Sequence, residues 1–182
     1  MAQAQLKSLD DLVKHVGRYP EEAFVFVREG LPYATEQMHG AETPLHRELH
    51  EYMSTHQCDW GELAAKYFAG ALPEPISMAI VEAGGWEKMN RHVSGRELCW
   101  GLRDYAQRRW GLMARCVLES WNIRHTSDFG RVVFGFIDFD LMQKQSGDAI
   151  EDFEDQFDFE QAFDVAYRNA LKSAPVESES AE

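Results

Sequence analysis

Cysteine is scarce in this chain of 182 residues, and long apolar runs are absent. The three cysteines, Cys58, Cys99 and Cys116, are scattered and odd in number, which argues against a disulfide framework and favours a reducing compartment. No apolar run approaches the roughly 18 residues that a membrane-spanning helix needs. The first residues include early acids and lack the apolar stretch of a secretory signal. These absences predict a cytoplasmic protein that does not associate with a membrane.

Catalytic motifs are absent as well. The sequence contains no phosphate-binding loop, no dinucleotide-binding glycine pattern and no serine elbow. Cys99 and Cys116 lie in segments expected to be helical, where a buried, inert thiol is the usual reading. Asp138 and Asp140 are expected to face water at a helix end rather than to act as a carboxylate pair. The sequence therefore favours a protein without enzymatic activity or cofactor, although it does not exclude an enzyme.

Positive charge is in short supply, with 18 basic against 31 acidic side chains and a net charge of −13. Residues 86–131 nevertheless carry nine basic and five acidic side chains, whereas residues 132–182 carry three and thirteen. Because nucleic acids and anionic membranes require a positive surface, the overall charge disfavours both as partners. The arginine-rich middle segment still leaves room for a local anion site.

Signals for helices dominate what the sequence does contain. Serine, threonine or aspartate is followed three residues later by an acid or amide in several places, which is typical of a helix start. Helix starts are expected at Ser8, Pro20, Thr43, Asp59, Ser94, Asp158 and either Thr126 or Ser127. Pro32 is expected to break or kink the second helix.

The pattern as a whole predicts an all-α fold, a compact multi-helix domain. The helical period is lost from residue 141 to residue 153, and Ser146-Gly147-Asp148 has the chemistry of a turn. The sequence therefore leaves one small β-hairpin near 141–153 as an alternative to purely helical structure. We expect a single helical domain over 1–172 and a disordered acidic tail over 173–182.

Apolar side chains at helical spacing indicate which residues form the core. In the helix expected after Ser94 they are Leu98, Leu102, Tyr105 and Ala106. In the following helix, after Gly111, they are Leu112, Met113, Cys116, Val117 and Trp121.

Four segments occur in a recognisable order: GRYPEEAFVFVREGL, RHVSGRELCWGLRDYA, GLMARCVLESWNIRHTSDFGRVVF and DAIEDFEDQFDFEQAF. Together they resemble an uncharacterised bacterial family described from planctomycetes and verrucomicrobia, over residues 10–39 and 90–165. Relative to that family, residues 40–89 look like a helical insertion, and Pro32 departs from its smoother second helix. The resemblance implies a cytoplasmic bacterial protein. It carries over no functional residue, because the family has no assigned activity.

Five arginines of the middle segment are candidates for binding an anion or a partner: Arg96, Arg103, Arg108, Arg109 and Arg124. A guanidinium group binds carboxylate or phosphate with two parallel hydrogen bonds, which lysine does less well. The simpler interpretation is internal, because the acidic segment 148–164 of the same chain offers carboxylates for these arginines.

The region 94–131 also resembles a winged helix-turn-helix in outline, with three helices before the open hairpin. The helix expected at Thr126 or Ser127 carries one arginine and ends in acids, which makes it a poor recognition helix. Nucleic-acid binding through helices 94–131 stays an alternative, disfavoured by the net charge.

Histidines cluster within the expected insertion. His46 and His50 are one helical turn apart, and His56 and Cys58 follow closely, so these four side chains are a candidate zinc site. Glu48 is not at the position that a zinc protease requires. The simpler interpretation is histidines on a solvated helix face, for which removal of His46 and His50 leaves the melting temperature unchanged.

The acidic stretch from Asp148 to Asp164 contains four phenylalanines, which we expect to anchor it to the core with its acids outward. An alternative is a docking surface for a basic partner. The sequence as a whole favours a non-enzymatic, cytoplasmic protein-interaction or adaptor protein whose partner is another protein.

Overall fold

The computed structural model describes residues 8–145, 147–165, 168–169 and 172. These residues form helices and their connections, and none of them is in a strand, so the predicted all-α fold class is confirmed. The chain divides into two compact units. Unit 1 comprises the residues up to Gln37 and those from Val93 onward, and unit 2 comprises Met38–His92. Within the described ranges, no helix has the length and hydrophobicity needed to cross a membrane.

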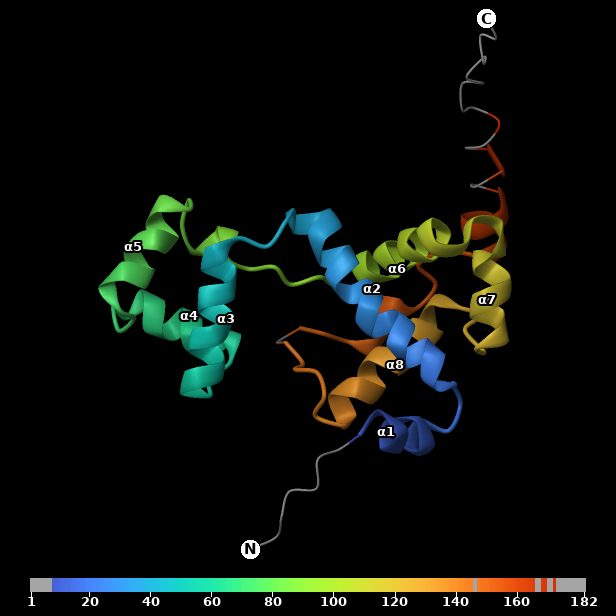
Figure 1. The fold of residues 1–182 in the computed structure, drawn as a ribbon, viewed down its shortest axis with the longest axis horizontal. Helices are drawn as coiled ribbons and strands as arrows, with labels where there is room; N and C mark the ends of the chain where they lie inside the picture. The colour runs from blue at the N-terminus through green and yellow to red at the C-terminus, as the bar shows by residue number, and fades with distance from the viewer. Residues whose placement is uncertain (1–7, 146, 166–167, 170–171, 173–182) are drawn as a thin grey trace, which may run out of the picture. The chain divides into compact units, whose positions relative to one another are not determined.

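Unit 1 is built from helices at both ends of the chain (Figure 1). Its elements are α1 (Leu9–Val16), α2 (Glu21–His39, which belongs to unit 1 as far as Gln37), α6 (Gly95–Trp110), the 3₁₀ helix η2 (Gly111–Met113), α7 (Ala114–Ser120), α8 (Thr126–Asp138), the 3₁₀ helix η3 (Ile150–Phe153) and the π-helix η4 (Glu160–Val165). The expected capping boxes of Ser8 with Asp11 and of Ser94 with Glu97 both form, so the starts of α1 and α6 are confirmed.

The core of unit 1 forms where α2, α6 and α8 approach closely. Phe24, Leu102 and Phe129 are fully buried in it. A Cβ on Gly101 of α6 would collide with Ala34 of α2, so only glycine lets these two backbones come so near. Of the residues expected to be buried in α6, Leu98, Leu102 and Ala106 are buried and Tyr105 is half-buried.

Helix α2 runs without interruption through Pro32, so of the two expected effects of this proline, a break or a kink, the break is wrong. Pro32 lies on the exposed side of the helix, where water can solvate the carbonyl that loses its N–H partner. One turn away, the Thr35 hydroxyl donates a 2.9 Å hydrogen bond to the carbonyl of Leu31.

The segment near 141–153 contains the 3₁₀ helix η3, and none of its described residues forms a hairpin, so that expectation is wrong. Ser146 lies outside the described residues. Asp148 accepts a hydrogen bond from the amide of Gln145, and Asp152 accepts one from the amide of Ala149. Such local side-chain bonds occupy the amide groups that a β-ladder would use.

The segment after Gly111, which forms η2 and α7, buries a different face from the one that its helical spacing predicts. Leu112 and Met113 are 50% and 59% exposed, and Cys116 is exposed as well. Ala114 and Leu118 are buried instead. The cause is the 3₁₀ turn of η2, which has about three residues per turn and so shifts the phase of the helical pattern.

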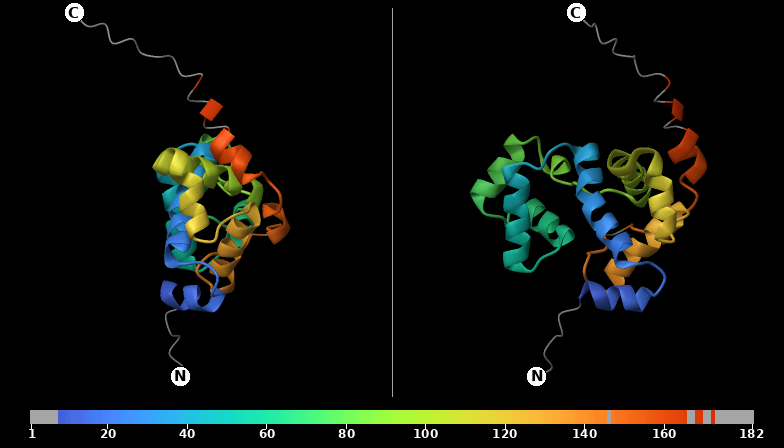
Figure 2. Two further views of the ribbon diagram at one scale, coloured as in Figure 1. Left: turned by 90° about the vertical axis from the view of Figure 1, so that its right-hand side faces the viewer. Right: turned by 45° about the vertical axis from the view of Figure 1, so that its right-hand side comes forward.

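Unit 2 contains α3 (Pro44–His56), α4 (Trp60–Phe68), α5 (Glu74–Glu82) and the 3₁₀ helix η1 (Trp86–Lys88), which two further views show (Figure 2). Its buried hydrophobic residues are Leu49, Cys58, Leu63, Leu72, Ile76, Ile80 and Met89. Among the described residues, this core shares no member with the core of unit 1.

The two ends of unit 2 are held together by hydrogen bonds. The ring Nε2 of His39 lies 2.9 Å from the carbonyl oxygen of His92, and Arg91 donates a 2.8 Å hydrogen bond to the carbonyl of Gly40. The expected insertion over 40–89 lies within this unit, and its being an insertion relative to other proteins stays a prediction. The expected tail over 173–182 and residues 1–7 lie outside the described residues.

Candidate functional site

The centre of the candidate site is Asp128, a fully buried carboxylate near the start of α8. Its Oδ2 atom accepts hydrogen bonds from the backbone amides of Arg124 and His125, at 2.9 and 3.1 Å. An acid at this position accepts hydrogen bonds from amide groups that a helix start leaves without a partner. Its negative charge also interacts favourably with the positive end of the helix dipole. The local sequence therefore fixes the orientation of the carboxylate.

The other oxygen of Asp128 gathers three donors from two parts of the chain. The Tyr19 hydroxyl donates at 2.7 Å, Arg18 Nη2 at 3.1 Å and Arg131 Nη1 at 2.8 Å. Burial alone would raise the pKa of Asp128, but the hydrogen bonds from Tyr19 and the two amides, together with the charge of Arg18, hold it below its ordinary value. Asp128 is therefore an anion at neutral pH.

Tyr19 acts as a hydrogen-bond donor and not as a base. Burial, together with its hydrogen bond to Asp128, raises the pKa of Tyr19 to about 12. The hydroxyl consequently stays protonated across the physiological range and keeps its hydrogen bond to the carboxylate.

Two guanidinium groups share this single carboxylate, so among the described residues one of the two positive charges has no counter-charge. The side chains of Arg18 and Arg131 are 54% and 43% exposed, whereas that of Asp128 is not exposed at all. The remaining N–H groups of both arginines are thus accessible while Asp128 holds each side chain in place. Such fixed donors are suited to bind an anion from solution.

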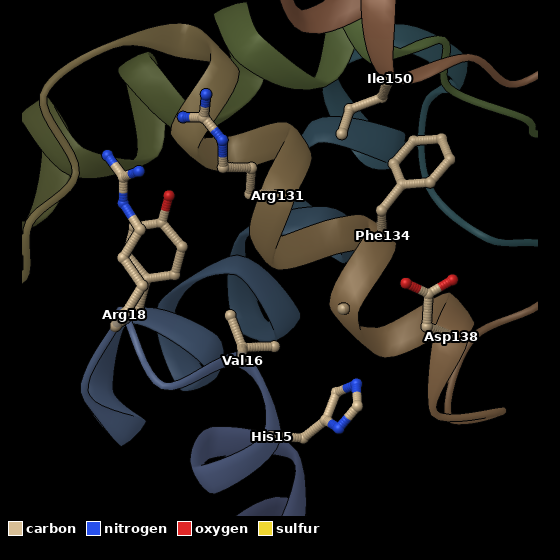
Figure 3. Close-up of a pocket in the computed structure, with 9 residues that line it drawn as sticks. His15, Val16, Arg18, Arg131, Phe134, Asp138 and Ile150 are labelled. Carbon is tan, nitrogen blue, oxygen red and sulfur yellow. The ribbon is translucent and has the colours of Figure 1, made fainter.

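A pocket of about 320 Å³ lies beside these arginines (Figure 3). One wall is a face of α8, lined by Arg131, Phe134, Gly135 and Asp138. The other wall is the end of α1 and the connection to α2, lined by His15, Val16, Arg18 and Tyr19, and Ile150 of η3 completes it.

The pocket is polar at both sides and apolar between them. Arg18 and Arg131 lie at one side, His15 and Asp138 at the other, as Figure 3 shows. A Cβ on Gly135 would lie only 3.1 Å from Val16, so glycine allows the two walls to approach. Among the described residues that line the pocket, none is a serine or a cysteine.

The five arginines singled out from the sequence are not among the described residues that line this pocket. Arg103 pairs with Asp104 at 2.7 Å, Arg109 pairs with Glu29 at 2.6 Å, and Arg108 lies over the ring of Tyr33. Arg96 and Arg124 are exposed, and in the described part of the chain their side chains make no ion pair. The structure therefore does not bring these five together into one site.

In the described part of the chain none of these five pairs with the acidic segment 148–164, but another arginine of the middle segment does, because the Nη1 atom of Arg115 lies 2.9 Å from Asp164. The same guanidinium also contacts Glu119 at 2.7 Å. The carboxylates that pair with Arg103 and Arg109 are those of Asp104 and Glu29, so these two arginines are paired internally, with partners outside the segment 148–164.

Sequence reasoning missed Arg18, Tyr19, Asp128 and Arg131 as a group. Asp128 carries the available local signal, because an acid three residues after the N-cap marks a helix start. Its partners Arg18 and Tyr19 lie 110 and 109 residues away, and spacing along the chain gives no sign of them.

The candidate zinc residues are engaged in other contacts. His46 is buried, its Nδ1 accepts from the Thr43 amide at 3.1 Å, and its Nε2 lies 3.3 Å from the Lys88 carbonyl oxygen. His50 contacts Glu42 at 3.4 Å, the His56 ring packs at a tilt against the ring of Tyr52, and Cys58 is buried in the core of unit 2. Within the described ranges, no three His, Cys, Asp or Glu side chains are arranged to hold a metal ion.

Comparison with known proteins adds no relative: no family model, no curated protein and no solved structure matches the chain. The resemblance to the uncharacterised bacterial family stays a prediction.

Proposed function

We propose that this chain is a binding protein without catalytic activity of its own, and that unit 1 recognises a small ligand bearing a carboxylate or phosphate group. The observation that carries the proposal is the pair Arg18 and Arg131, both fixed on buried Asp128 and both lining the pocket. The proposed place of action is the cytoplasm.

The energetics of the site support anion binding. Asp128 already restrains both guanidinium groups in the unbound protein. The two arginine side chains therefore lose less conformational entropy when a ligand binds than unrestrained arginines would lose. Each charge-assisted hydrogen bond contributes about 1.5–3 kcal/mol. A volume of about 320 Å³ lies at the lower end of the range for small-molecule sites.

The charges of the arginine-rich segment favour this proposal over nucleic-acid binding. Arg103, Arg109 and Arg115 each pair with a carboxylate of the chain, which removes much of the positive surface that a phosphate backbone needs. The net charge of −13 acts in the same direction.

An experiment with two simple anions tests the proposal. Hexanoate and hexyl phosphate are titrated into the full chain by calorimetry at low ionic strength and neutral pH. We expect at least one to bind, and Arg18→Gln to weaken it about tenfold through loss of a charged hydrogen-bond donor. Arg96→Gln, which removes an exposed arginine of α6 outside the pocket, is the matched control and should bind as the wild type does.

Binding of neither anion, or an equal loss in Arg18→Gln and Arg96→Gln, would contradict the proposal. Circular dichroism of each variant shows whether the fold is retained.

A second candidate function is protein interaction, in which the chain acts as an adaptor for another protein. The favouring observation is the exposure of adjacent Leu112 and Met113 in unit 1, at 50% and 59%. Large apolar side chains exposed side by side are typical of contact surfaces. Affinity capture from the native host with the wild type and with Leu112→Ser/Met113→Ser tests it: loss of a specific co-purifying protein from the variant supports the adaptor function.

A further inference from the structure

We infer that the pocket beside Asp128 takes a bipolar small molecule, with an anionic group at one end, an amine at the other and an aliphatic spacer between them. This inference rests on the proposed anion site and extends it by assigning the opposite end of the pocket.

The face of α8 sets out this polarity along one helix. Arg131, Phe134 and Asp138 are separated by three and four residues, so they project from the same face. Arg131 and Asp138 lie two turns apart, which is about 10 Å along the axis. A single helix face thus presents a cation, an aromatic ring and an anion in that order.

The facing wall carries a second cation at the arginine side and an imidazole at the other side. Arg18 lies at the side of Arg131, and His15 lies at the side of Asp138, as the close-up shows (Figure 3). The His15 ring is also in contact with the Phe139 ring, at a centroid distance of 5.2 Å. A ligand anion at the arginine side would therefore have its other end directed to the side that contains Asp138.

Asp138 is free to receive a positive group. Its side chain is exposed, and it makes no ion pair with a described residue. A ligand with two anionic ends would bring a second negative charge to this carboxylate and would be repelled. An ammonium group at the same place would pair with it, with three N–H donors for the carboxylate oxygens.

The middle of the pocket requires an apolar spacer. Val16 and Phe134 lie between the two polar sides (Figure 3), Ile150 also lines the pocket, and Gly135 contributes no side chain to the space. Methylene groups can pack there without leaving polar atoms unpaired. These features together point to an ω-amino acid, for which 6-aminohexanoate is a suitable probe.

The test compares three probes on the full chain by calorimetry at low ionic strength: 6-aminohexanoate, hexanoate and hexylamine. We expect 6-aminohexanoate to bind about fivefold more tightly than hexanoate, because an exposed ion pair contributes up to about that factor. Hexylamine, which lacks the anion, should bind most weakly.

Variants assign the preference to Asp138. Asp138→Asn should remove the preference for 6-aminohexanoate while hexanoate binds at least as well as before. Glu36→Gln, which removes one exposed acid of α2 outside the pocket, is the charge-matched control and should keep the preference. Arg18→Gln should weaken both ligands.

If hexanoate binds and 6-aminohexanoate binds no more tightly, or if Asp138→Asn keeps the preference, the bipolar inference is wrong and the anion site stands. If neither hexanoate nor 6-aminohexanoate binds, the bipolar inference fails, and the proposed anion site fails with it only when hexyl phosphate does not bind either.

Discussion

The hydroxyl of Tyr19 donates a 2.7 Å hydrogen bond to the carboxylate of Asp128, across 109 residues of sequence. This bond ties the connection between α1 and α2 to the start of α8. The same carboxylate oxygen also holds Arg18 and Arg131. One buried acid therefore supports both the packing of unit 1 and the arginines of the pocket.

Asp128→Asn should destabilise the protein by about 2–4 kcal/mol, because the amide cannot compensate two guanidinium groups or accept all five hydrogen bonds. Urea unfolding followed by circular dichroism measures the change. Asp138→Asn, an exposed acid on the same helix, is the control and should stay within about 0.5 kcal/mol of the wild type. Equal stability of the two variants would show that the buried network contributes little.

The stabilisation by Asp128 should depend on pH in a defined direction. Because the pKa of Asp128 is lowered in the folded protein, its contribution is complete above the unfolded value of about 3.9 and is lost as the pH falls through the folded value. The difference in unfolding free energy between wild type and Asp128→Asn should be constant from pH 7 to about 5 and narrow below about 4. Urea melts at successive pH values measure it, and a narrowing that is complete by pH 5 would contradict the assignment.

Leu102→Ala should cost about 2–5 kcal/mol, because Leu102 is fully buried between α6 and α2 and its removal leaves a cavity. Arg96→Ala on the same helix should change stability by less than about 0.5 kcal/mol, since its side chain is exposed. Urea melts of the two variants provide the comparison. Similar costs for both would mean that burial in α6 does not decide its stability.

His46→Ala should destabilise unit 2 by about 1–2 kcal/mol, because the ring caps the start of α3 through Thr43 and also contacts Lys88. The expectation from the sequence, that removal of both histidines leaves the melting temperature unchanged, rests on an exposed His46 and is wrong about its burial. His50→Ala, at an exposed position, should have almost no effect. Calorimetric melting of the single variants separates the two, and an unchanged His46→Ala variant would argue against the capping role.

Replacement of residues 40–89 by a short Gly/Ser linker should leave a cooperatively folding unit 1. The described residues that form its core all lie outside this segment. A urea melt monitored by circular dichroism checks the expectation. A variant that shows no cooperative transition would mean that unit 1 depends on unit 2 for its fold.

Local patterns in the sequence were sufficient to predict the helix starts and most of the α6 core. The Ser94 and Glu97 capping box involves two residues three apart, and Leu98 and Leu102 are one turn apart, so both features follow from helix geometry alone. The exposure of Leu112 and Met113 could not be predicted in this way, because the 3₁₀ turn changes the phase.

The candidate site depends on contacts between distant positions. Asp128 is recognisable as a helix-start residue, but its burial against Tyr19 and Arg18 results from the packing of the whole unit. His46 illustrates the same limit, since its buried ring contacts the carbonyl of Lys88, 42 residues further along. Helical spacing identifies a face but not what covers that face.

The hydrogen bonds of His39 with His92 and of Arg91 with Gly40 have a consequence for the order of folding. Helices α2 and α6 pack through Ala34 and Gly101, and the intervening Met38–His92 unit must be closed into a loop before they can meet. Once unit 2 has formed, its two ends are held close together. The connection between α2 and α6 then has the closure entropy of a loop of only a few residues. A tenfold shorter effective loop lowers the entropy cost of closure by about 2 kcal/mol. If unit 2 folds first, it would therefore lower the entropy cost of assembling unit 1, although the two cores are built from different residues.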